Sequence, residues 1–590
     1  MNRFTAAALA LVAVAASCTS SSGRPGATAT GGTPATTTAP PTTVTTTTEG
    51  APPCPAPATP EPSTASPEAG SAAATALELS RTTFSCARAV VLVSTADLNR
   101  VAAAARLAAG LGGPLLFGSS AADPNLDSEI ARLGPARLAL VGDDVTASAP
   151  SYTEVVRISG ATVDIIDSVN VLLGALATVP LPATAGVPTV AALAESIDGG
   201  LGLAPAAPPP PPTTTTAAAG TGATTTTTPT TAPPAPEPET AGFTFGIGTR
   251  GEAWLVDDGS PQIAMAAVVA ADVSGGLVAI VDGDDLRRSV GAAQAMRNSA
   301  APIEQVHVLG ETGRGTAWQA RVLQRGDELP GGGFLLFEGT RMVSLYGNVE
   351  TAVLGVLGEQ GPEASVERLR TLAAPYAADG RTIIPAFEII ATVAAAEPGL
   401  DGDYSNEGDP ETLRPWIEVA AREGLYVLLD LQPGRTDFLT QAKLYEEFLR
   451  LPHVGLALDP EWRLDPGEFH LQTFGGVNAA EVNTVVEWLA GIVREEALPQ
   501  KMLLLHQFRL SMLPDRELIE TPPELAVVVQ MDGQGFVDDK YATWGVLTTQ
   551  PDAGRYHWGW KNFFDEDSPG PLEAEPILDL EPTVVYVSFQ

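Results

Sequence analysis

The sequence is poor in cysteine, histidine and positive charge. It has 3 cysteines and 5 histidines among 590 residues, and its 33 basic residues face 70 acidic ones, for a net charge of −37. No His-x-His or HExxH spacing occurs, so the sequence predicts no metal site and no cofactor. A strongly acidic chain is repelled by phosphate backbones, which argues against nucleic acid as a partner.

Long apolar runs are also missing, apart from a short one near the N-terminus. Arg3 precedes the run AAALALVAVAA, which predicts a signal peptide over residues 1–17 and is too short for a typical membrane span. The stretch VAASC resembles the lipobox of exported bacterial lipoproteins. The resemblance implies a lipid on Cys18, a membrane partner through that anchor, and a place on the outer face of the plasma membrane or in the cell wall. An ordinary signal peptide with an incidental cysteine is the alternative.

The two remaining cysteines are Cys54 and Cys86. Outside the membrane they are free to form one disulfide, which would pin the N-terminal segment to the first folded region. Two free thiols are the alternative.

Composition divides the rest of the chain. Residues 18–76 and 204–240 consist mostly of Thr, Pro, Ala, Ser and Gly. Such tracts cannot bury enough apolar area to offset their chain entropy. We therefore expect a lipidated, disordered tether over residues 18–76 and a Pro/Thr-rich linker over 204–240.

Two similar segments lie beside the linker, at residues 77–203 and 241–334. Each contains an apolar strand, an Ala-rich helix and further short strands, and Gly142 and Gly310 close corresponding strands. Alternating strands and helices indicate a parallel α/β layer. The similarity between the segments indicates an internal repeat.

The first segment resembles the type 2 cell-wall-binding repeat of Gram-positive surface proteins. The resemblance lies in VVLVS, the Ala-rich helix, GGPLLF, LGPARLALVG and VVRISG, over roughly residues 86–175, and more weakly over 250–325. It implies a small α/β module that docks on a cell-wall polymer. The alternative is a structural α/β domain that presents the C-terminal region.

The C-terminal region, residues 335–590, alternates apolar strands with helical patterns. Strands are expected at 341–347, 382–389, 425–432, 454–462, 501–508, 525–533 and 583–589, with a less certain seventh strand in ATWGVLT or RYHWGW. Eight such units have the dimension of a (βα)8 barrel, with a doubly wound sheet as the alternative. The predicted fold class is therefore α/β, with repeat-like modules followed by a (βα)8 barrel and disordered linkers.

Polar residues end most of these strands, where a barrel places its active-site mouth. Carboxylates flanked by aromatic side chains suit glycoside hydrolysis, which needs one protonated and one ionised carboxyl group. We expect Glu461 to be the general acid, Asp532 or Asp430 to be the nucleophile or base, and Asp459 to position Glu461 or bind substrate. The expected substrate-binding residues are Tyr346, Glu388, Trp462, His506, Gln507, Arg509, Trp560 and Lys561.

The same region resembles the (βα)8 glycoside hydrolases through LALDPEW, LLDLQPG, QMDGQG and HWGWKNFFDED. The resemblance implies hydrolysis of a cell-wall or environmental polysaccharide. A non-catalytic glycan-binding or scaffold protein of the cell envelope is the alternative. No G-x-S-x-G motif occurs, which disfavours acyl-enzyme chemistry.

Overall fold

The structure, a computed structural model, describes residues 71–147, 154–159, 244–246, 248–310 and 315–590. The predicted signal peptide, the predicted linker, Cys18 and Cys54 lie outside the described residues. The chain divides into two compact units, Met1–Thr316 and Ala317–Gln590. Along the part of the chain that the structure describes, no helix combines the length and the apolar character needed to cross a membrane.

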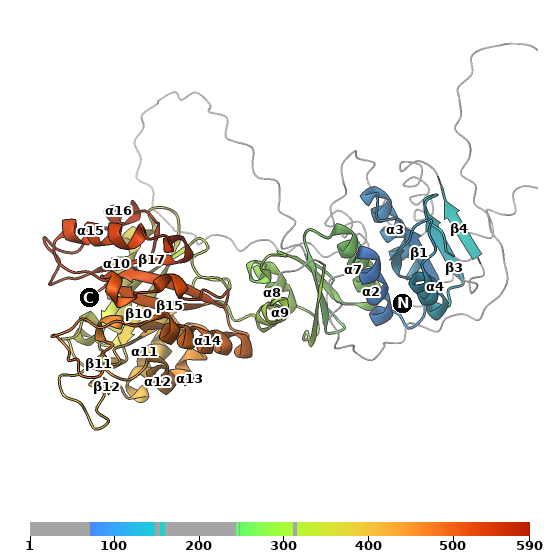
Figure 1. The fold of residues 1–590 in the computed structure, drawn as a ribbon. Helices are drawn as coiled ribbons and strands as arrows, with labels where there is room; N and C mark the ends of the chain where they lie inside the picture. The colour runs from blue at the N-terminus through green and yellow to red at the C-terminus, as the bar shows by residue number, and fades with distance from the viewer. Residues whose placement is uncertain (1–70, 148–153, 160–243, 247, 311–314) are drawn as a thin grey trace, which may run out of the picture. The chain divides into compact units, whose positions relative to one another are not determined.

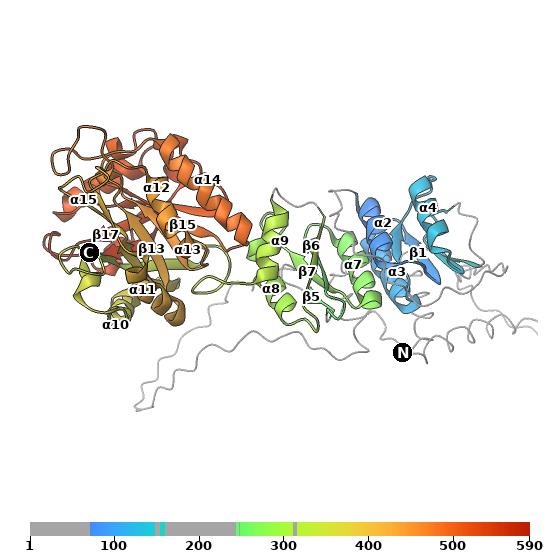
Figure 2. The same ribbon diagram turned by 90° about the horizontal axis from the view of Figure 1, so that it is seen from below.

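The first unit contains two small four-stranded sheets. The first sheet and its helices comprise α2 (Ala72–Thr83), β1 (Ala89–Val93), α3 (Leu98–Leu111), β2 (Leu115–Phe117), α4 (Pro124–Leu133), β3 (Arg137–Val141) and β4 (Glu154–Ile158). The second comprises β5 (Thr244–Phe245), β6 (Glu252–Asp257), α7 (Pro261–Ser274), β7 (Leu277–Val281), η1 (Leu286–Arg288), α8 (Val290–Arg297) and β8 (Gln305–Leu309). Helices α7 and α8 cover opposite faces of the second sheet (Figures 1 and 2).

The two sheets repeat one topology, which confirms the expected internal repeat. Strands run in the order β2-β1-β3 in the first sheet and β7-β6-β8 in the second, all parallel. Gly142 follows β3 and Gly310 follows β8, with φ angles of 105° and 106°. Side chains other than glycine rarely adopt this backbone conformation, so the matching turns require glycine in both copies.

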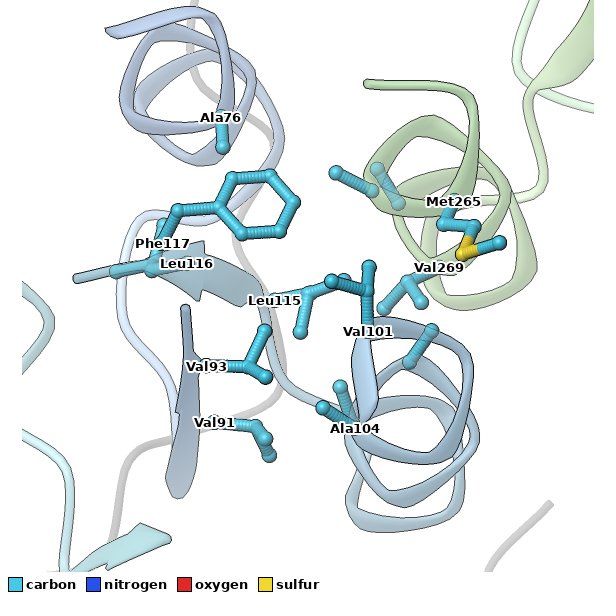
Figure 3. Close-up of a cluster of buried hydrophobic side chains, with 14 of the residues drawn as sticks. Ala76, Val91, Val93, Val101, Ala104, Leu115, Leu116, Phe117, Met265 and Val269 are labelled. Atoms are coloured by element: carbon cyan, nitrogen blue, oxygen red, sulfur yellow. The ribbon is translucent and has the colours of Figure 1, made fainter. Parts of the chain in front are cut away.

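One apolar core joins the two copies. Helix α7 of the second copy packs against α2 and α3 of the first, and buried residues of both sheets belong to one cluster. Figure 3 shows Met265 and Val269 of α7 beside Val101 of α3 and Leu115 of β2. The alanines of α3 and α7 have small side chains, so the helices can approach closely while excluding water.

The first helix begins earlier in the chain than the composition indicates. Helix α2 starts at Ala72, within the tether expected to end at residue 76, and the Ser71 side chain accepts a hydrogen bond from the Ala74 amide at its start. Leu77 and Leu79 are buried in the shared core. Burial of this apolar face stabilises a helix whose Ala- and Thr-rich sequence resembles the preceding tract.

The second unit is a closed barrel of eight parallel strands, as expected from the sequence. The strands are β9 (Thr340–Gly347), β10 (Thr382–Ile390), β13 (Tyr426–Leu431), β14 (Val454–Leu458), β15 (Lys501–Gln507), β16 (Leu525–Met531), β17 (His557–Asn562) and β18 (Val584–Phe589). Strand β18 pairs with β9 and closes the ring.

Helices on the outside of the barrel connect the strands (Figures 1 and 2). They are α10 (Pro362–Ala373), α11 (Pro410–Glu423), α12 (Phe438–Ala442), α13 (Glu446–Leu449), α14 (Ala479–Glu496), α15 (Val537–Thr548) and α16 (Ala574–Leu578). Short 3-10 turns lie at Val356–Glu359, Ala374–Ala377, Lys443–Tyr445, Pro460–Trp462, Leu510–Met512, Arg516–Leu518 and Ala553–Arg555. A small hairpin of β11 (Thr392–Ala394) and β12 (Ser405–Glu407) follows β10.

The segment before β9 belongs to the floor of the barrel. Helix α9 spans Thr316–Arg325, and the side chain of Arg321 in this helix donates a hydrogen bond to the backbone carbonyl of Arg494 in α14. Leu329, Leu336 and Phe337 pack with inward-facing residues of the strands in one buried cluster. This floor seals the N-terminal end of the barrel with apolar side chains, so polar chemistry is left to the opposite end.

The seventh strand is β17, in the sequence RYHWGWKN, and the alternative ATWGVLT is wrong because it forms helix α15. The stretch HWGWKNFFDED therefore begins as a barrel strand. The inward-facing residue near the end of this strand is Lys561. The strand thus brings a cation, not a carboxylate, to the barrel interior.

Candidate active site

The barrel interior changes from apolar to ionisable along the strands. Alternate residues of a strand face the same side, so each inward row can be followed from Ala386 to Glu388, or from Leu504 to His506. The lower positions belong to the apolar cluster. The upper, buried positions carry Ser344, Tyr346, Glu388, Asp430, Asp459, His506, Gln530, Asp532, Lys561 and Ser588. These groups gather at the C-terminal end of the barrel, where active sites of this fold are built.

His506 is the centre of this cluster. Its Nδ1 lies 2.9 Å from Asp532 Oδ2, and its Nε2 lies 3.0 Å from Glu388 Oε1 and 3.6 Å from Asp430 Oδ1. Burial alone would lower the pKa of His506, but the carboxylates of Asp532 and Asp430 outweigh burial and raise the pKa well above its usual value. The imidazole is therefore a buried cation.

Lys561 supplies the second buried cation. Its Nζ lies 3.1 Å from Asp532 Oδ1 and 3.6 Å from the centre of the Tyr346 ring. Burial would raise the pKa of Asp532, but Lys561 and His506 together lower it. Asp532 is therefore an ionised carboxylate held between two cations.

Tyrosines hold the other two carboxylates. Tyr346 donates to Asp430 Oδ2 at 2.8 Å, and Tyr586 donates to Glu388 Oε2 at 2.8 Å. Burial raises the pKa of Asp430 to about 6, although the nearby His506 cation opposes the rise. Asp430 therefore changes its charge close to neutral pH.

The network keeps hydrogen-bonding capacity in reserve. Glu388 Oε1, Asp430 Oδ1, Asp532 Oδ1 and His506 Nε2 are buried and make close ion-pair contacts. Among the described residues none of these four atoms has an aligned hydrogen bond, in spite of the short distances. Of the four, Asp430 Oδ1 has the longest contact, 3.6 Å from His506 Nε2, and because buried polar atoms are normally paired it has acceptor capacity left for a bound molecule.

Asp459 and Glu461 stand at the edge of this cluster but do not share an extended strand. Strand β14 ends at Leu458, and the Asp459 side chain accepts from the Glu461 amide at 3.2 Å to begin the 3-10 turn Pro460–Trp462. The strand expected over residues 454–462 therefore ends four residues early, before both carboxylates. Asp459 is buried, whereas Glu461 is partly exposed.

Both carboxyl groups are shifted towards the protonated form. Burial raises the pKa of Asp459 well above its usual value. Burial, followed by the charge of Asp532, raises the pKa of Glu461 to about 7, while Lys561, His506 and Arg509 act in the opposite direction. The site therefore combines an ionised carboxylate, Asp532, with a protonatable carboxyl group, Glu461.

The structure brings most of the sequence-predicted residues together. Tyr346, Glu388, Asp430, His506, Asp532 and Lys561 form one contact network, and Asp459 and Glu461 couple to it through charge. Trp462 meets His470 edge-on at 5.4 Å between ring centres in the loop after β14. Arg509 is exposed just beyond β15.

Gln507 and Trp560 face away from the cluster. Gln507 Oε1 accepts from Arg516 at 2.7 Å, and Arg516 in turn pairs with Asp552. Trp560 packs against Trp544 of α15. Each is one residue away from an inward-facing position of its strand, so its side chain points to the opposite face of the sheet. The placement of these two residues therefore does not support the expectation that they bind substrate.

Sequence reasoning missed several inward-facing residues. Tyr586 bonds both Glu388 and Ser344, and Gln530 donates to Ser588 at 2.6 Å. The period-two alternation of the apolar runs was the available signal, because Tyr586 and Ser588 occupy the same row.

Exposed apolar side chains surround this end of the barrel. They lie on loops that follow the strands and comprise Val353, Leu400, Phe469, Leu471, Phe474, Leu510, Phe536 and Phe564. Apolar side chains on these loops are available to contact a molecule bound at this end of the barrel. We call this set the apolar rim.

Two other predicted features lie apart from the cluster. Cys86 is disulfide-bonded, but Cys54 is outside the described residues, so its pairing with Cys86 stays a prediction. Among the described residues, Asp401, Asp403 and Glu407 of the β11–β12 hairpin are close enough to hold a cation. Burial raises the pKa of Asp403 to about 6.

Comparisons with known proteins give one distant structural similarity to report. No protein-family model matches the chain, and no curated protein matches it. A solved structure described as "Cwp6 from Clostridium difficile" matches with 10% sequence identity and a TM-score of 0.29, over 56% of this chain. The match spans 63% of that protein. A similarity at this level carries no argument about activity.

Proposed function

We propose that the barrel hydrolyses glycosidic bonds in a cell-wall or environmental polysaccharide. The observation that carries this proposal is the electrostatic coupling of Glu461 with Asp532 at the C-terminal end of the barrel. Burial and the charge of Asp532 raise the pKa of Glu461 to about 7, while two cations lower the pKa of Asp532. Glycoside hydrolysis needs one carboxyl group in each protonation state.

In this proposal Glu461 is the general acid. Its proton passes to the glycosidic oxygen as the bond to the anomeric carbon breaks. The carboxylate of Asp532 stabilises the developing positive charge on the sugar, as a nucleophile or as the base that takes a proton from attacking water. His506 and Lys561 keep Asp532 ionised and fix both of its oxygens.

Asp430, Asp459 and Glu388 support this pair. Asp430 Oδ1 lies 3.6 Å from His506 and has no aligned hydrogen bond among the described residues, which suits a contact to a sugar hydroxyl group. The apolar rim suits a polymer, because aromatic side chains stack on sugar rings beyond the bond that is cleaved. The rest of the chain would serve delivery: a lipid on Cys18, a tether, and repeat modules that dock on wall polymer.

A specific observation favours a second candidate, a glycan-binding protein without catalysis. Asp532 is already bound by His506 and Lys561, and Glu388 by Tyr586. Carboxylates engaged in this way can hold sugar hydroxyl groups without attacking carbon. The second candidate keeps the buried polar cluster and the apolar rim but assigns no proton transfer to Glu461.

Product release from purified cell-wall polysaccharide by the full chain distinguishes the two. Glu461→Gln should lower kcat at least about a hundredfold, the cost of losing an acid catalyst, and leave glycan binding unchanged. Glu367→Gln, on the outer helix α10, is the matched control and should leave kcat unchanged. Polysaccharide retained by the wild-type chain without any product would support the binding protein instead.

A further inference from the structure

Arg509 is a cation at the mouth that the proposed reaction does not use. It follows β15 directly, beyond His506 in the same strand, and its side chain is exposed. It lies close enough to Glu461 to influence the charge of that carboxyl group. Its charge therefore acts on the proposed acid.

The guanidinium of Arg509 has no partner for its N–H groups within the described unit. Residues 317–590 are all described, and every other arginine among them makes an ion pair or donates a hydrogen bond. These other arginines are Arg321, Arg325, Arg341, Arg368, Arg370, Arg381, Arg414, Arg422, Arg435, Arg450, Arg463, Arg494, Arg516 and Arg555. In a chain with 70 acidic residues, an unpaired arginine beside a group of carboxylates is an exception that calls for an explanation.

The Arg509 side chain is nevertheless positioned. Its guanidinium lies 3.8 Å from the centre of the Phe474 ring and 5.4 Å from that of Phe508. The two rings meet edge-on at 5.6 Å. A guanidinium stacked on an aromatic face keeps its edge N–H groups free, in the planar fork that matches a carboxylate. The aromatic support reduces the entropy lost when an anion binds.

We propose that Arg509 binds a carboxylate carried by a sugar residue of the substrate, so that the barrel takes an acidic glycan. This inference rests on the glycan function proposed above. A carboxylate matches the planar fork of the Arg509 guanidinium, and a phosphate group is the alternative that the experiment tests. Phe474 and Phe536 of the apolar rim would hold the neighbouring sugar faces.

The experiment uses the full chain with two probes whose sugar residues carry carboxylates, hyaluronan and polygalacturonate. Each is offered in native form and after chemical reduction of its carboxyl groups to hydroxymethyl groups, which removes the charge and keeps the sugar backbone. A glycerol-phosphate polymer tests the phosphate. Binding is measured in wild type, Arg509→Gln, Arg509→Lys and the control Arg422→Gln, whose arginine lies exposed on α11. Turnover is measured in parallel.

We expect at least one native probe to bind, and Arg509→Gln to weaken that binding about 10- to 100-fold, as for a charged hydrogen-bond pair. The reduced form of that probe should bind wild type and Arg509→Gln alike. Arg509→Lys should show an intermediate loss, because it keeps the charge but not the fork. In the turnover assay Arg509→Gln should raise KM. The control Arg422→Gln should change neither binding affinity nor KM.

The outcomes separate this inference from the hydrolase proposal. Carboxylate-dependent binding through Arg509 without product would keep the acidic-glycan specificity and overturn catalysis. Hydrolysis that is indifferent to carboxyl reduction and to Arg509→Gln would keep the hydrolase and overturn the specificity. Arg509-dependent binding of the phosphate polymer alone, or no binding of any carboxylated probe, would also overturn it.

Discussion

The two units of the chain use the same kind of layer, parallel strands covered by helices, but they bury different chemistry. In the first unit the strand interiors and the helices α2, α3 and α7 contribute apolar side chains to one shared core. Charged side chains buried in this unit have partners. Glu129, for example, forms an ion pair with Arg132 and accepts a hydrogen bond from Ser80. In the second unit six ionisable groups replace the apolar core at one end of the barrel.

This difference bears on which part of the molecule contributes stability and which part is the candidate site for chemistry. Burying charges costs several kcal/mol for each ion, and mutual pairing often does no more than offset that cost. An apolar interior of similar volume would stabilise the barrel as well or better. The carboxylates around His506 are thus difficult to explain as a stabilising device, whereas a site that acts on a substrate explains them.

The largest effect should come from removing the cation at the centre of the barrel cluster. His506→Leu leaves the carboxylates of Asp532, Glu388 and Asp430 without their shared partner. We expect the free energy of unfolding of the barrel to fall by about 3–5 kcal/mol, the cost of breaking a buried ion pair. Urea denaturation followed by tryptophan fluorescence measures it, since every tryptophan but Trp254 lies in this unit.

His453→Leu is the matched control for this prediction. Burial lowers the pKa of His453, so the ring is neutral, and it has one hydrogen-bonding contact, with the Ile417 carbonyl at 3.3 Å. Its loss should cost about 1 kcal/mol, as for an ordinary hydrogen bond. Equal losses in the two variants would mean that the ion pairs of His506 contribute no more stability than the single hydrogen bond of His453.

The next effect should appear in the first unit and leave the second untouched. Leu115 lies in the shared core beside α7 (Figure 3). Leu115→Ala should lower the free energy of unfolding of this unit by about 3 kcal/mol through the cavity it leaves. Scanning calorimetry should show a lower melting temperature for one transition, with glycan binding unchanged.

Exposed Leu444 provides the comparison for this cavity. Leu444→Ala removes the same atoms from a solvent-exposed position and should change stability by less than about 0.5 kcal/mol. A Leu115→Ala chain that loses glycan binding together with its first transition would show that the barrel depends on the repeat modules. The separation of a structural unit from a chemical one would then fail.

The sequence predicts apolar strands well and side-chain direction less well. Seven barrel strands follow from runs such as LYVLLDL, because a strand covered on both faces is apolar throughout. Strand β17 was ambiguous because HWGWKN has no aliphatic run, while ATWGVLT in α15 resembles one. Helix α2 was missed at its start because its Ala- and Thr-rich composition resembles that of the tether.

The position of a residue at the end of a strand predicts the site better than its residue type does. Glu388, Asp430, His506 and Asp532 were predicted because they end strands, and they belong to inward rows. Gln507 and Trp560 also end strands, but a step of one residue turns a side chain to the opposite face. The turn at Asp459 depends on a side-chain cap, and the periodicity of the preceding strand gives no sign of it.

A smaller effect should distinguish the two copies of the repeat. Gly142 and Gly310 share a φ near 105°, so alanine is strained at both positions, by about 1–3 kcal/mol. An added Cβ at Gly310 would lie 2.9 Å from the Asp257 Cβ, whereas at Gly142 it would meet the movable carboxylate of Asp144. Gly310→Ala should therefore lower the melting temperature of the first unit more than Gly142→Ala does.

Scanning calorimetry of the two variants, read on the transition that Leu115→Ala shifts, measures this difference. The equal backbone strain serves as an internal control, because only the surroundings of the added methyl group differ. A larger loss for Gly142→Ala would indicate that the first copy, not the second, has the more rigid turn.

The smallest effect is the pH dependence that the barrel should have through Glu461. Its pKa of about 7 in the folded chain is higher than the value of about 4.3 expected in the unfolded chain. Between these pH values the folded state therefore holds a proton that the unfolded state has lost, and stability falls as pH rises. Because Glu461 is partly exposed, solvent screening should limit the change to the order of 1 kcal/mol.

Urea denaturation of the barrel at pH 5 and pH 7.5 measures this change. Glu461→Gln should flatten the fall, because the variant has no proton to lose there, whereas Glu367→Gln on the outer helix should keep it. Asp430, with a pKa of about 6, contributes in the same direction and should leave a residual slope. Asp532 acts oppositely, since its lowered pKa removes stability as pH falls below about 4. An unchanged slope in Glu461→Gln would mean that this carboxyl group is ionised at neutral pH, and Glu461 could not then be the general acid.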